Sequence, residues 1–532
     1  MQGKKHYQEK LFVSFQLSDH VPEDNFYRRL KEVLDFSFLY KTTAKYYGRE
    51  GQKSIDPVVF MKLILAGYLE NLNSDRRIIS TCKMRLDILY FLGYNLDEEF
   101  PWHSTLSRTR QLYGQEVFTE IFKSVLKQCI DKGMISGRRQ AIDGVYVKAN
   151  ASLDSMIERE ILNDAELYGS ELEANKEADS PVVNMKNNDF ENNNGLKPKK
   201  NPHNNTHYNP SDPDAKMSVK PGKATALNYL GEVSVDTASH MITHIQAFTA
   251  DKGDSKCLPE VLKNVIENLK ENELIIEEVI ADTGFSSGVA LRSLEENNIV
   301  GYIPNRPQFV YERPGFTYND KEDYYTCPGD KQLIYKGTWK DGNHYNKFYG
   351  ANKKDCNVCS CKDLCSIYNK RNAFLKQTID RPYYARMHVR MQTKKAKMLM
   401  KKRQSTVEPV IGTLVNYLGM KRVNTKGLIQ ANKCMTMAAV AYNIKKLLKH
   451  SSKKINTNLQ SLKNQALTFS NIVLKGLRWF RTSILCKNLF YNHRIRALYN
   501  ESIYPQPLLL LDRYYNNNTR IFHFVLNYYN NV

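Results

Sequence analysis

The segment ELIIEEVIADTGFSSGVALRSLEENNIVGYIP, residues 273–304, decides how the centre of this chain folds. Residues 273–281 have the pattern of a strand, residues 287–298 carry apolar positions at helical spacing, and residues 299–304 form a second strand pattern. Two strands joined by a helix favour parallel pairing within one sheet. The segment therefore predicts an α/β unit.

Three more strand patterns precede this unit. Residues 140–149 read QAIDGVYVKA, and residues 226–235 and 241–247 are joined by a turn at 236–240. A helix is expected at 255–270. The order of three strands, helix, strand, helix and strand predicts a mixed sheet flanked by helices, which is an α/β fold.

The flanking sequence divides the chain into five regions. Residues 1–138 are mostly helical, with helices expected at 58–69, 75–92, 104–112 and 115–132 and with Ser104 as a cap. This region is either a DNA-binding domain that recognises DNA ends or a plain helical bundle. Residues 139–304 form the first part of the core, interrupted by a flexible insertion at about 154–213 that is rich in Asn, Pro and Lys. Residues 305–380 are a cysteine-rich insertion, residues 381–450 complete the core with helices at 385–402, 407–418 and 428–448, and residues 451–532 are a basic tail.

Length and composition limit the classes of protein. The chain has 532 residues, which suggests two to four domains, and its formal charge of +21 favours an anionic partner such as nucleic acid or an acidic membrane surface. No apolar leader is visible at Met1–Lys10 and no apolar run approaches 20 residues, so we expect a cytoplasmic protein without a membrane span. Ten cysteines in such a chain do not indicate a disulfide framework.

The charge distribution isolates one residue, Glu408. Residues 381–500 contain 25 Lys and Arg but only this one acidic residue. A helical segment this basic is typical of contact with a phosphate backbone. Glu408 is either the partner of Arg403 or Lys402 in a salt bridge, or a metal ligand placed where nucleic acid lies.

Two aspartates are candidate partners for Glu408. Asp282 follows an apolar strand, and ligands of open α/β sheets bind beyond the carboxyl ends of strands. Asp143 lies within an apolar strand, where a carboxylate is costly unless it is paired or bound to metal. The alternatives are that Asp282 caps the next helix and that Asp143 faces solvent on an edge strand.

Together these residues resemble the bacterial insertion-sequence transposases of the DDE class, which have a ribonuclease-H-like fold. The resemblance covers residues from about 53 to 449, and the ordered set of motifs is more specific than any single one. The matching positions are Ile55-Asp56-Pro57 with Lys62, His103-Ser104-Thr105 with Arg108 and Arg110, Ala141–Gly144, Val147–Ser152, Asp212–Ala215, Lys220–Lys223, Ala281–Phe285, Val407-Glu408 with Gly412, Gly419, Arg422 and Gly427, and Ala441-Tyr442-Asn443.

The resemblance implies that Asp143, Asp282 and Glu408 form a catalytic triad that holds Mg²⁺ or Mn²⁺. Water would cut the transposon end, and the freed 3′-hydroxyl would attack target DNA. Our candidates for holding the DNA backbone are Arg403, Lys421 and Arg422.

The family usually has a lysine seven residues after the glutamate, where this chain has Val415. The resemblance also implies a homodimer on paired DNA ends.

A cluster of cysteines indicates a second metal site. Cys356, Cys359, Cys361 and Cys365 fall within ten residues, and Cys327 lies upstream, so five thiols are candidates for a tetrahedral zinc site. Related transposases carry a similar set in which Cys361 is the less expected member. The resemblance therefore favours Cys327, Cys356, Cys359 and Cys365 as ligands of a structural Zn²⁺.

Two alternatives to the transposase remain open. One is a non-catalytic DNA-binding protein derived from a transposase, for which Val415 is a weak argument. The other is a metal-dependent nuclease of the same fold, which the same triad would serve. Strand-transfer products would separate the transposase from the nuclease.

Overall fold

The computed structural model describes residues 14–450 and a few before them, except 49, 51–53, 160–202, 220–223, 307–313, 342–343, 363–364 and 369–373. Residues 1–450 form one compact unit and residues 451–532 another, of which no residue is described. The expected insertion at 154–213 lies largely outside the described residues, and the expected basic tail lies wholly outside them.

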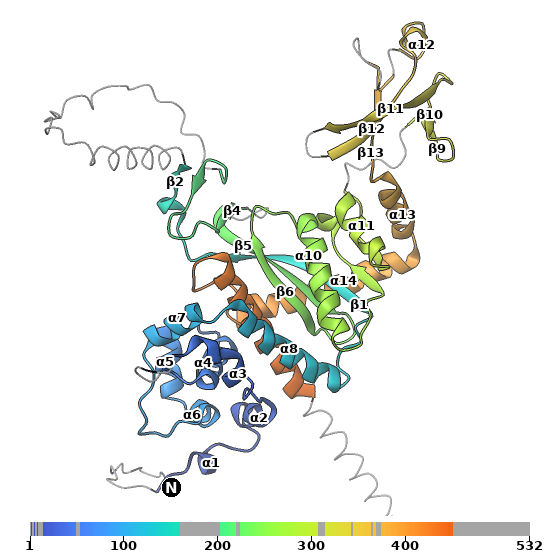
Figure 1. The fold of residues 1–532 in the computed structure, drawn as a ribbon. Coiled ribbons are helices and arrows are strands. Elements are labelled where there is room, and N and C mark those ends of the chain that lie inside the picture. Colours follow the sequence, from blue (N-terminus) through green and yellow to red (C-terminus); the bar gives the residue numbers. More distant parts are fainter. Residues whose placement is uncertain are drawn as a thin grey trace, which may run out of the picture. The chain divides into compact units, whose positions relative to one another are not determined.

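A six-stranded mixed sheet forms the centre of the first unit (Figure 1). In the order β6-β5-β1-β7-β8, the first three strands are antiparallel and the last three are parallel, while the short β4 also pairs with β5. This is the ribonuclease-H-like order, so the expected fold class is confirmed. The bounds are β1 (Arg139–Lys148), β4 (Lys216–Ser218), β5 (Ala226–Asp236), β6 (Ile242–Thr249), β7 (Glu278–Ile280) and β8 (Val300–Tyr302).

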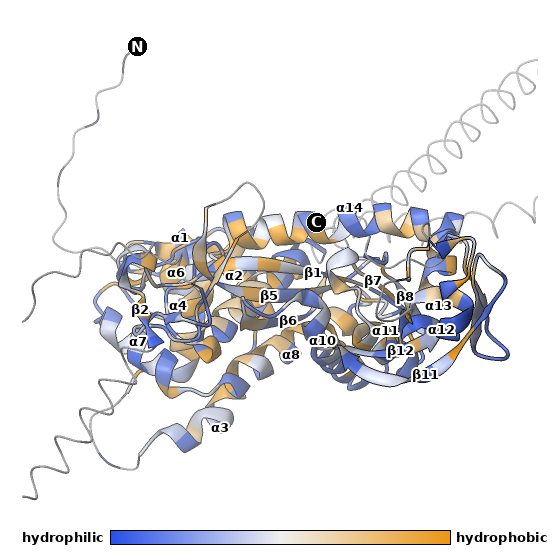
Figure 2. Ribbon diagram, turned by 90° about the horizontal axis from the view of Figure 1, so that it is seen from above, coloured by the Kyte–Doolittle hydropathy of each residue, from blue (hydrophilic) through white to orange (hydrophobic). Residues whose placement is uncertain are grey.

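Helices cover both faces of this sheet. Figure 2 shows α14 (Lys394–Tyr417) on one side of β1 and β5, and α10 (Asp254–Lys270) on the other. α14 contacts β1, β5, β7 and β8, whereas α10 contacts β5 and β6. Next to β8 lie α11 (Gly288–Glu296) and α13 (Arg381–Met391).

The break between the last core helices differs from the sequence-based expectation. We expected it between 402 and 407, but it falls at Thr393, whose side chain accepts a hydrogen bond from the backbone N–H of Ala396 and caps α14. Ser405 and Thr406 are helical, and both hydroxyls donate to the carbonyl oxygen of Lys402 within the same helix. One continuous helix therefore carries both Arg403 and Glu408.

The N-terminal region is helical, as expected. The side chain of Asp56 caps α4 by accepting from the N–H groups of Val58 and Val59. The expected helix at 75–92 is two helices, and Ser104 is not a cap because α7 begins one residue earlier. The helices are α1 (Leu17–His20), α2 (Phe26–Val33), α3 (Leu39–Thr43), η1 (Ala44–Tyr46), α4 (Pro57–Leu69), α5 (Asp75–Lys83), α6 (Leu86–Leu92), α7 (His103–Leu112) and α8 (Gln115–Asp131).

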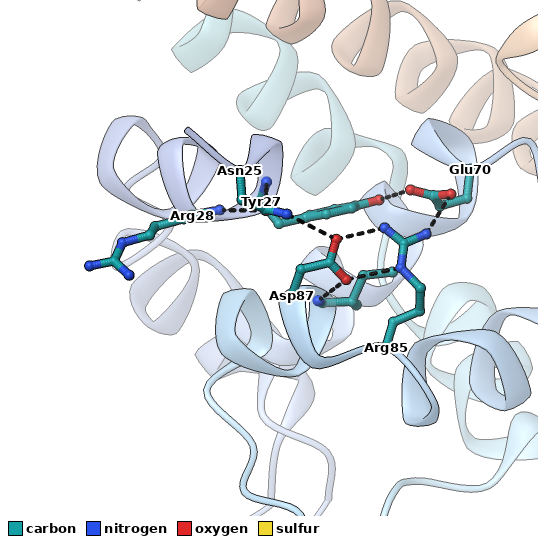
Figure 3. A network of polar contacts seen from close by, with 7 residues as sticks. Asn25, Tyr27, Arg28, Glu70, Arg85 and Asp87 are labelled. Carbon is teal, nitrogen blue, oxygen red and sulfur yellow. Dashed lines mark hydrogen bonds and ion pairs between the residues drawn. The ribbon is translucent and has the colours of Figure 1, made fainter. Parts of the chain in front are cut away.

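A polar network, which we call the Arg85 network, ties α2, α4 and α6 together (Figure 3). Arg85 donates to both oxygens of Asp87, at 2.9 and 2.7 Å, and to Glu70 at 3.0 Å. The hydroxyl of Tyr27 donates to Glu70 at 2.7 Å, and Asn25 donates to Asp87 at 3.4 Å. Each carboxylate in this network has at least two donors.

The helix at 428–450 joins the N-terminal helices to the sheet. The ammonium of Lys433 is buried and donates to the carbonyl oxygens of Arg110 and Tyr113. Asn443, on the same helix, bonds the backbone of Ile242 in β6 through both its oxygen and its nitrogen. One continuous hydrophobic core spans the helices, the sheet and this helix.

The cysteine-rich region contains a five-stranded antiparallel sheet that we did not expect, in the order β13-β12-β11-β10-β9. It has its own small core of Phe316, Tyr325, Leu333, Tyr349 and Leu375. The elements are β9 (Thr317–Asn319), β10 (Tyr324–Thr326), β11 (Gln332–Asp341), β12 (His344–Gly350), α12 (Lys353–Asn357) and β13 (Phe374–Thr378).

The remaining described elements are short: η2 (Leu153–Ser155), β2 (Ile157–Glu158), β3 (His207–Tyr208) and η3 (Thr283–Phe285). Across the described residues, no helix combines the length and the apolar character that a membrane span requires.

Candidate active site

The sheet brings Asp143 and Asp282 to neighbouring strands. β1 and β7 run parallel, with Ala141 opposite Ile280, and each aspartate lies two residues further along its own strand direction. Asp143 is in the middle of β1, with its side chain 18% exposed. Asp282 lies two residues after the end of β7, and its Oδ1 accepts from the N–H of Gly284, so it does cap the short turn η3. The cap does not exclude a role in a site, because the second carboxylate oxygen of Asp282 is not used by this bond.

Among the residues that the structure describes, Arg403 on α14 is the basic residue that forms an ion pair with Asp143. Its Nη1 lies 3.0 Å from Asp143 Oδ2, and its side chain is only 9% exposed. Burial raises the pKa of the Asp143 carboxyl to about 6, an effect that Arg403 opposes and that the charge of Asp282 reinforces. The site therefore already presents a buried cation to the first aspartate.

Glu408 lies on α14 but on its exposed side. In the described part of the chain it forms no hydrogen bond or ion pair, so the salt bridge to Arg403 or Lys402 is not seen. The geometry brings Asp143, Asp282 and Arg403 together and leaves Glu408 on the neighbouring helix surface.

Two carboxylates that we did not single out from the sequence lie at the same place. Asp254 opens α10, and Glu232 lies in β5 opposite Gly144. Burial, followed by the charges of Asp254 and Asp143, raises the pKa of Glu232 well above its usual range. For Glu232 a signal existed, because an acidic residue interrupts the apolar strand pattern of 226–235 just as Asp143 interrupts that of 140–149.

The other proposed DNA contacts lie beyond the end of β1. Lys421 and Arg422 are exposed, and the backbone of this segment pairs with Lys148, which is also exposed. Arg422 donates to Asn150 Oδ1 at 2.9 Å. Val415, at the position where the family has lysine, packs against the hydrophobic core.

Four of the five clustered cysteines line one cavity in the cysteine-rich region. They are Cys327, Cys356, Cys359 and Cys365. Cys361 does not line it, and its Sγ lies 3.9 Å from the hydroxyl of Ser360. Burial, followed by the neighbouring thiols of Cys327, Cys365 and Cys359, raises the pKa of the Cys356 thiol.

The donor sets suit metals, although the side chains as they lie do not form a closed site. No three His, Cys, Asp or Glu side chains within the described ranges are placed so that they could hold a metal ion. The chemistry nevertheless fits, because carboxylate oxygens are the ligands that Mg²⁺ prefers and clustered thiolates are those that Zn²⁺ prefers.

Comparison with known proteins gives a consistent assignment. The family described as Transposase domain (DUF772) matches residues 15–112, and the family described as Transposase DDE domain matches residues 326–448, which include Glu408 and the five clustered cysteines. Asp143 and Asp282 lie between the two matches. No curated protein matches the chain.

Solved structures of transposases are also similar to this chain. A piggyBac transposase synaptic complex with hairpin DNA is 11% identical, with 81% of this chain and 77% of that chain covered and a TM-score of 0.31. A pre-cleavage Mos1 transpososome is 8% identical, with 48% of this chain and 61% of that chain covered and a TM-score of 0.14. The N-terminal helices are therefore similar to a transposase domain, and the segment that carries Glu408 is similar to a transposase DDE domain.

Proposed function

We propose that this protein is a DNA transposase that catalyses metal-dependent cleavage at transposon ends and strand transfer into target DNA. One observation carries the proposal: Asp143 and Asp282 lie on neighbouring strands of a ribonuclease-H-like sheet, beside a cationic side chain on α14. The transposase DDE domain match over α14 supports the same reading.

The residues that would hold Mg²⁺ or Mn²⁺ are Asp143, Asp282 and Glu408. Such an ion supplies positive charge that stabilises the attacking and leaving oxygens of a phosphoryl transfer. Arg403 fixes one oxygen of Asp143, which keeps that carboxylate in place beneath the reacting phosphate. We propose that Glu408, which is exposed on the same helix, joins them when DNA lies along α14.

The reaction has two in-line displacements at phosphorus. First, a water oxygen bonds to the phosphorus at the transposon end, and the P–O3′ bond breaks to leave a 3′-hydroxyl and a 5′-phosphate. Then that 3′-hydroxyl bonds to a phosphorus of the target strand and releases the target's own 3′-hydroxyl. Neither step needs an oxidant or a covalent enzyme intermediate, so positioning by the chain's side chains supplies most of the catalysis.

DNA is the proposed partner, both as transposon ends and as target. The exposed cations Lys148, Lys421 and Arg422 form a basic strip next to the end of β1 that suits a phosphate backbone. Arg403 is a further candidate contact, although it is engaged by Asp143 as described. We propose a homodimer on paired ends, since both ends must be held for strand transfer.

The test is cleavage of a plasmid that carries the element's own flanking sequences, in Mg²⁺, with the full chain. Asp143→Asn and Asp282→Asn should each lower the cleavage rate by at least about a thousandfold, in line with loss of a charged catalytic group. Asp251→Asn, an exposed aspartate three residues before Asp254, should cleave normally.

Three other outcomes would change the assignment. Cleavage without joined strand-transfer products would favour the nuclease. DNA binding without cleavage would favour the non-catalytic protein. If Glu408→Gln cleaves as the wild type does, Glu408 is not the third carboxylate of the triad.

We also propose that the cysteine-rich region holds a structural Zn²⁺ through Cys327, Cys356, Cys359 and Cys365. The cavity lined by these four cysteines, from which Cys361 is excluded, supports this choice. Elemental analysis should find about one zinc per chain, because a tetrahedral site uses four thiolates. Cys356→Ser should lose the metal and Cys361→Ser should keep it; equal retention by both variants would contradict the assignment.

A further inference from the structure

Asp254 lies at the same edge of the sheet as the two aspartates of the proposed triad. Two glycines make room for it: a Cβ atom at Gly144 would lie 2.9 Å from Asp254 Oδ1, and one at Gly284 would lie 2.7 Å from Asp254 Oδ2. The Gly284 position is also 2.9 Å from Asp282 Oδ1. The carboxylates of Asp254 and Asp282 thus face the same small gap, which the missing side chain of Gly284 leaves open.

Gly144 extends the same arrangement to β1. It directly follows Asp143, and Asp254 sits against its backbone where any larger residue would collide. Contacts below 3.0 Å are closer than real Cβ atoms approach other atoms, so both glycines are needed for Asp254 to occupy this place. The two glycines therefore leave room for Asp254 close to both Asp143 and Asp282.

Glu232 provides a second and independent observation. It is fully buried, at 0% exposure, and neither of its carboxylate oxygens has a hydrogen-bond partner in the described part of the chain. It lies opposite Gly144 across the β1–β5 pairing and beside Asp254. A buried carboxylate without a donor is costly, and a positive charge at the adjoining edge would offset that cost.

We propose that Asp254 is a fourth carboxylate of the divalent-cation site, joining Asp143 and Asp282, with the buried carboxyl group of Glu232 behind it. The inference rests on the proposed function, since it concerns the same site. The ligand class is a small, hard divalent cation such as Mg²⁺ or Mn²⁺, which prefers several carboxylate oxygens. The helix start at Asp254 fixes the direction from which this carboxylate enters the site.

The experiment is titration of the full chain with Mn²⁺ alone, without DNA, followed by electron paramagnetic resonance of the free ion. Asp254→Asn should raise the dissociation constant for Mn²⁺ at least tenfold. Asp251→Asn removes an equal charge from the exposed loop before α10 and should change it less than twofold. Equal affinity of Asp254→Asn and the wild type would overturn the inference.

A second variant tests the site without changing any charge. Gly144→Ala should displace Asp254 and weaken Mn²⁺ binding in the same direction, because the added methyl group occupies the position of its carboxylate. Thermal unfolding in EDTA checks that each variant is folded before it is titrated. Normal Mn²⁺ affinity in a folded Gly144→Ala variant would also count against the inference.

Asp143→Asn separates this inference from the proposed function. If Asp143→Asn weakens Mn²⁺ binding and Asp254→Asn does not, the three-carboxylate site stands and only the fourth ligand is rejected. If the wild-type chain binds no Mn²⁺, or if Asp143→Asn leaves binding unchanged, the result counts against both.

Discussion

Two regions of this molecule contain carboxylates near an arginine, and they differ in how many hydrogen-bond donors those carboxylates receive. In the Arg85 network of the N-terminal helices, Glu70 and Asp87 each receive at least two donors (Figure 3). At the sheet edge, Arg403 pairs with Asp143, while Glu232 is buried with neither oxygen hydrogen-bonded within the described residues. The carboxylates of the Arg85 network are therefore fully hydrogen-bonded, whereas, in the part of the chain that the structure describes, the carboxylate of Glu232 at the sheet edge is not.

The difference separates structure from function. A network whose acceptors are all matched by donors stabilises a particular packing of helices. A group of acids held together without matching cations lowers stability, and such strain is retained where a ligand of opposite charge binds. By this criterion we expect the Arg85 network to be structural, and the sheet edge fits the binding site proposed above.

The largest expected effect is at Arg403. At pH 8, Arg403→Ala should lower the free energy of unfolding by about 3–5 kcal/mol, because it leaves Asp143 buried without its partner. Urea denaturation in EDTA measures this change. The double variant Arg403→Ala/Asp143→Asn should recover most of the loss, and an equally unstable double variant would show that Arg403 acts through packing alone.

A smaller loss is expected at Arg85. Its side chain is 37% exposed, so Arg85→Ala should lower the free energy of unfolding by about 1–3 kcal/mol, because Glu70 loses one donor and Asp87 loses two hydrogen bonds. Repeating the urea denaturation with added Mn²⁺ tests whether the Arg85 network and the sheet edge are independent. Stabilisation by Mn²⁺ should be the same in Arg85→Ala and in the wild type, and a loss of that stabilisation would mean that the two regions are not independent.

The smallest effect should have the opposite sign. Glu232→Gln should raise the free energy of unfolding by about 1 kcal/mol at pH 8, because it removes a buried acid and adds a donor beside Asp254. The pKa of Glu232 is raised in the folded state, so its contribution to stability is full below the unfolded pKa and declines as pH rises.

The advantage of Glu232→Gln over the wild type should therefore grow from pH 5 to pH 9. Denaturation in EDTA across this range measures it. A constant difference would show that the pKa of Glu232 is not raised in the folded state.

Much of the core followed from patterns of apolar residues. The strands around Asp143 and the alternation of strand and helix after residue 273 predicted the parallel half of the sheet, so the closeness of Asp143 and Asp282 was foreseeable. Glu232 could have been found by the argument used for Asp143. Asp254 could not, because an acidic residue in the first turn of a helix is common and signals nothing unusual.

Other features depended on contacts that spacing does not encode. The exposed side of Glu408 is set by where α14 packs on the sheet, and the cap at Thr393 makes one helix where two were expected. Spacing left five cysteines open, and only the fold of the surrounding sheet separates Cys361 from the four that line the cavity. The strands of that region were missed because its core has few large apolar side chains.

The buried ammonium of Lys433 has a consequence for synthesis on the ribosome. It bonds the carbonyl of Tyr113 from 320 residues further along the chain, and both regions share one hydrophobic core. At about 5–20 residues per second, the N-terminal helices wait roughly 15–65 s before this helix emerges. During that interval the apolar surface that will receive it is uncovered, so a nascent or prematurely ended chain offers a binding surface to chaperones that the finished protein does not.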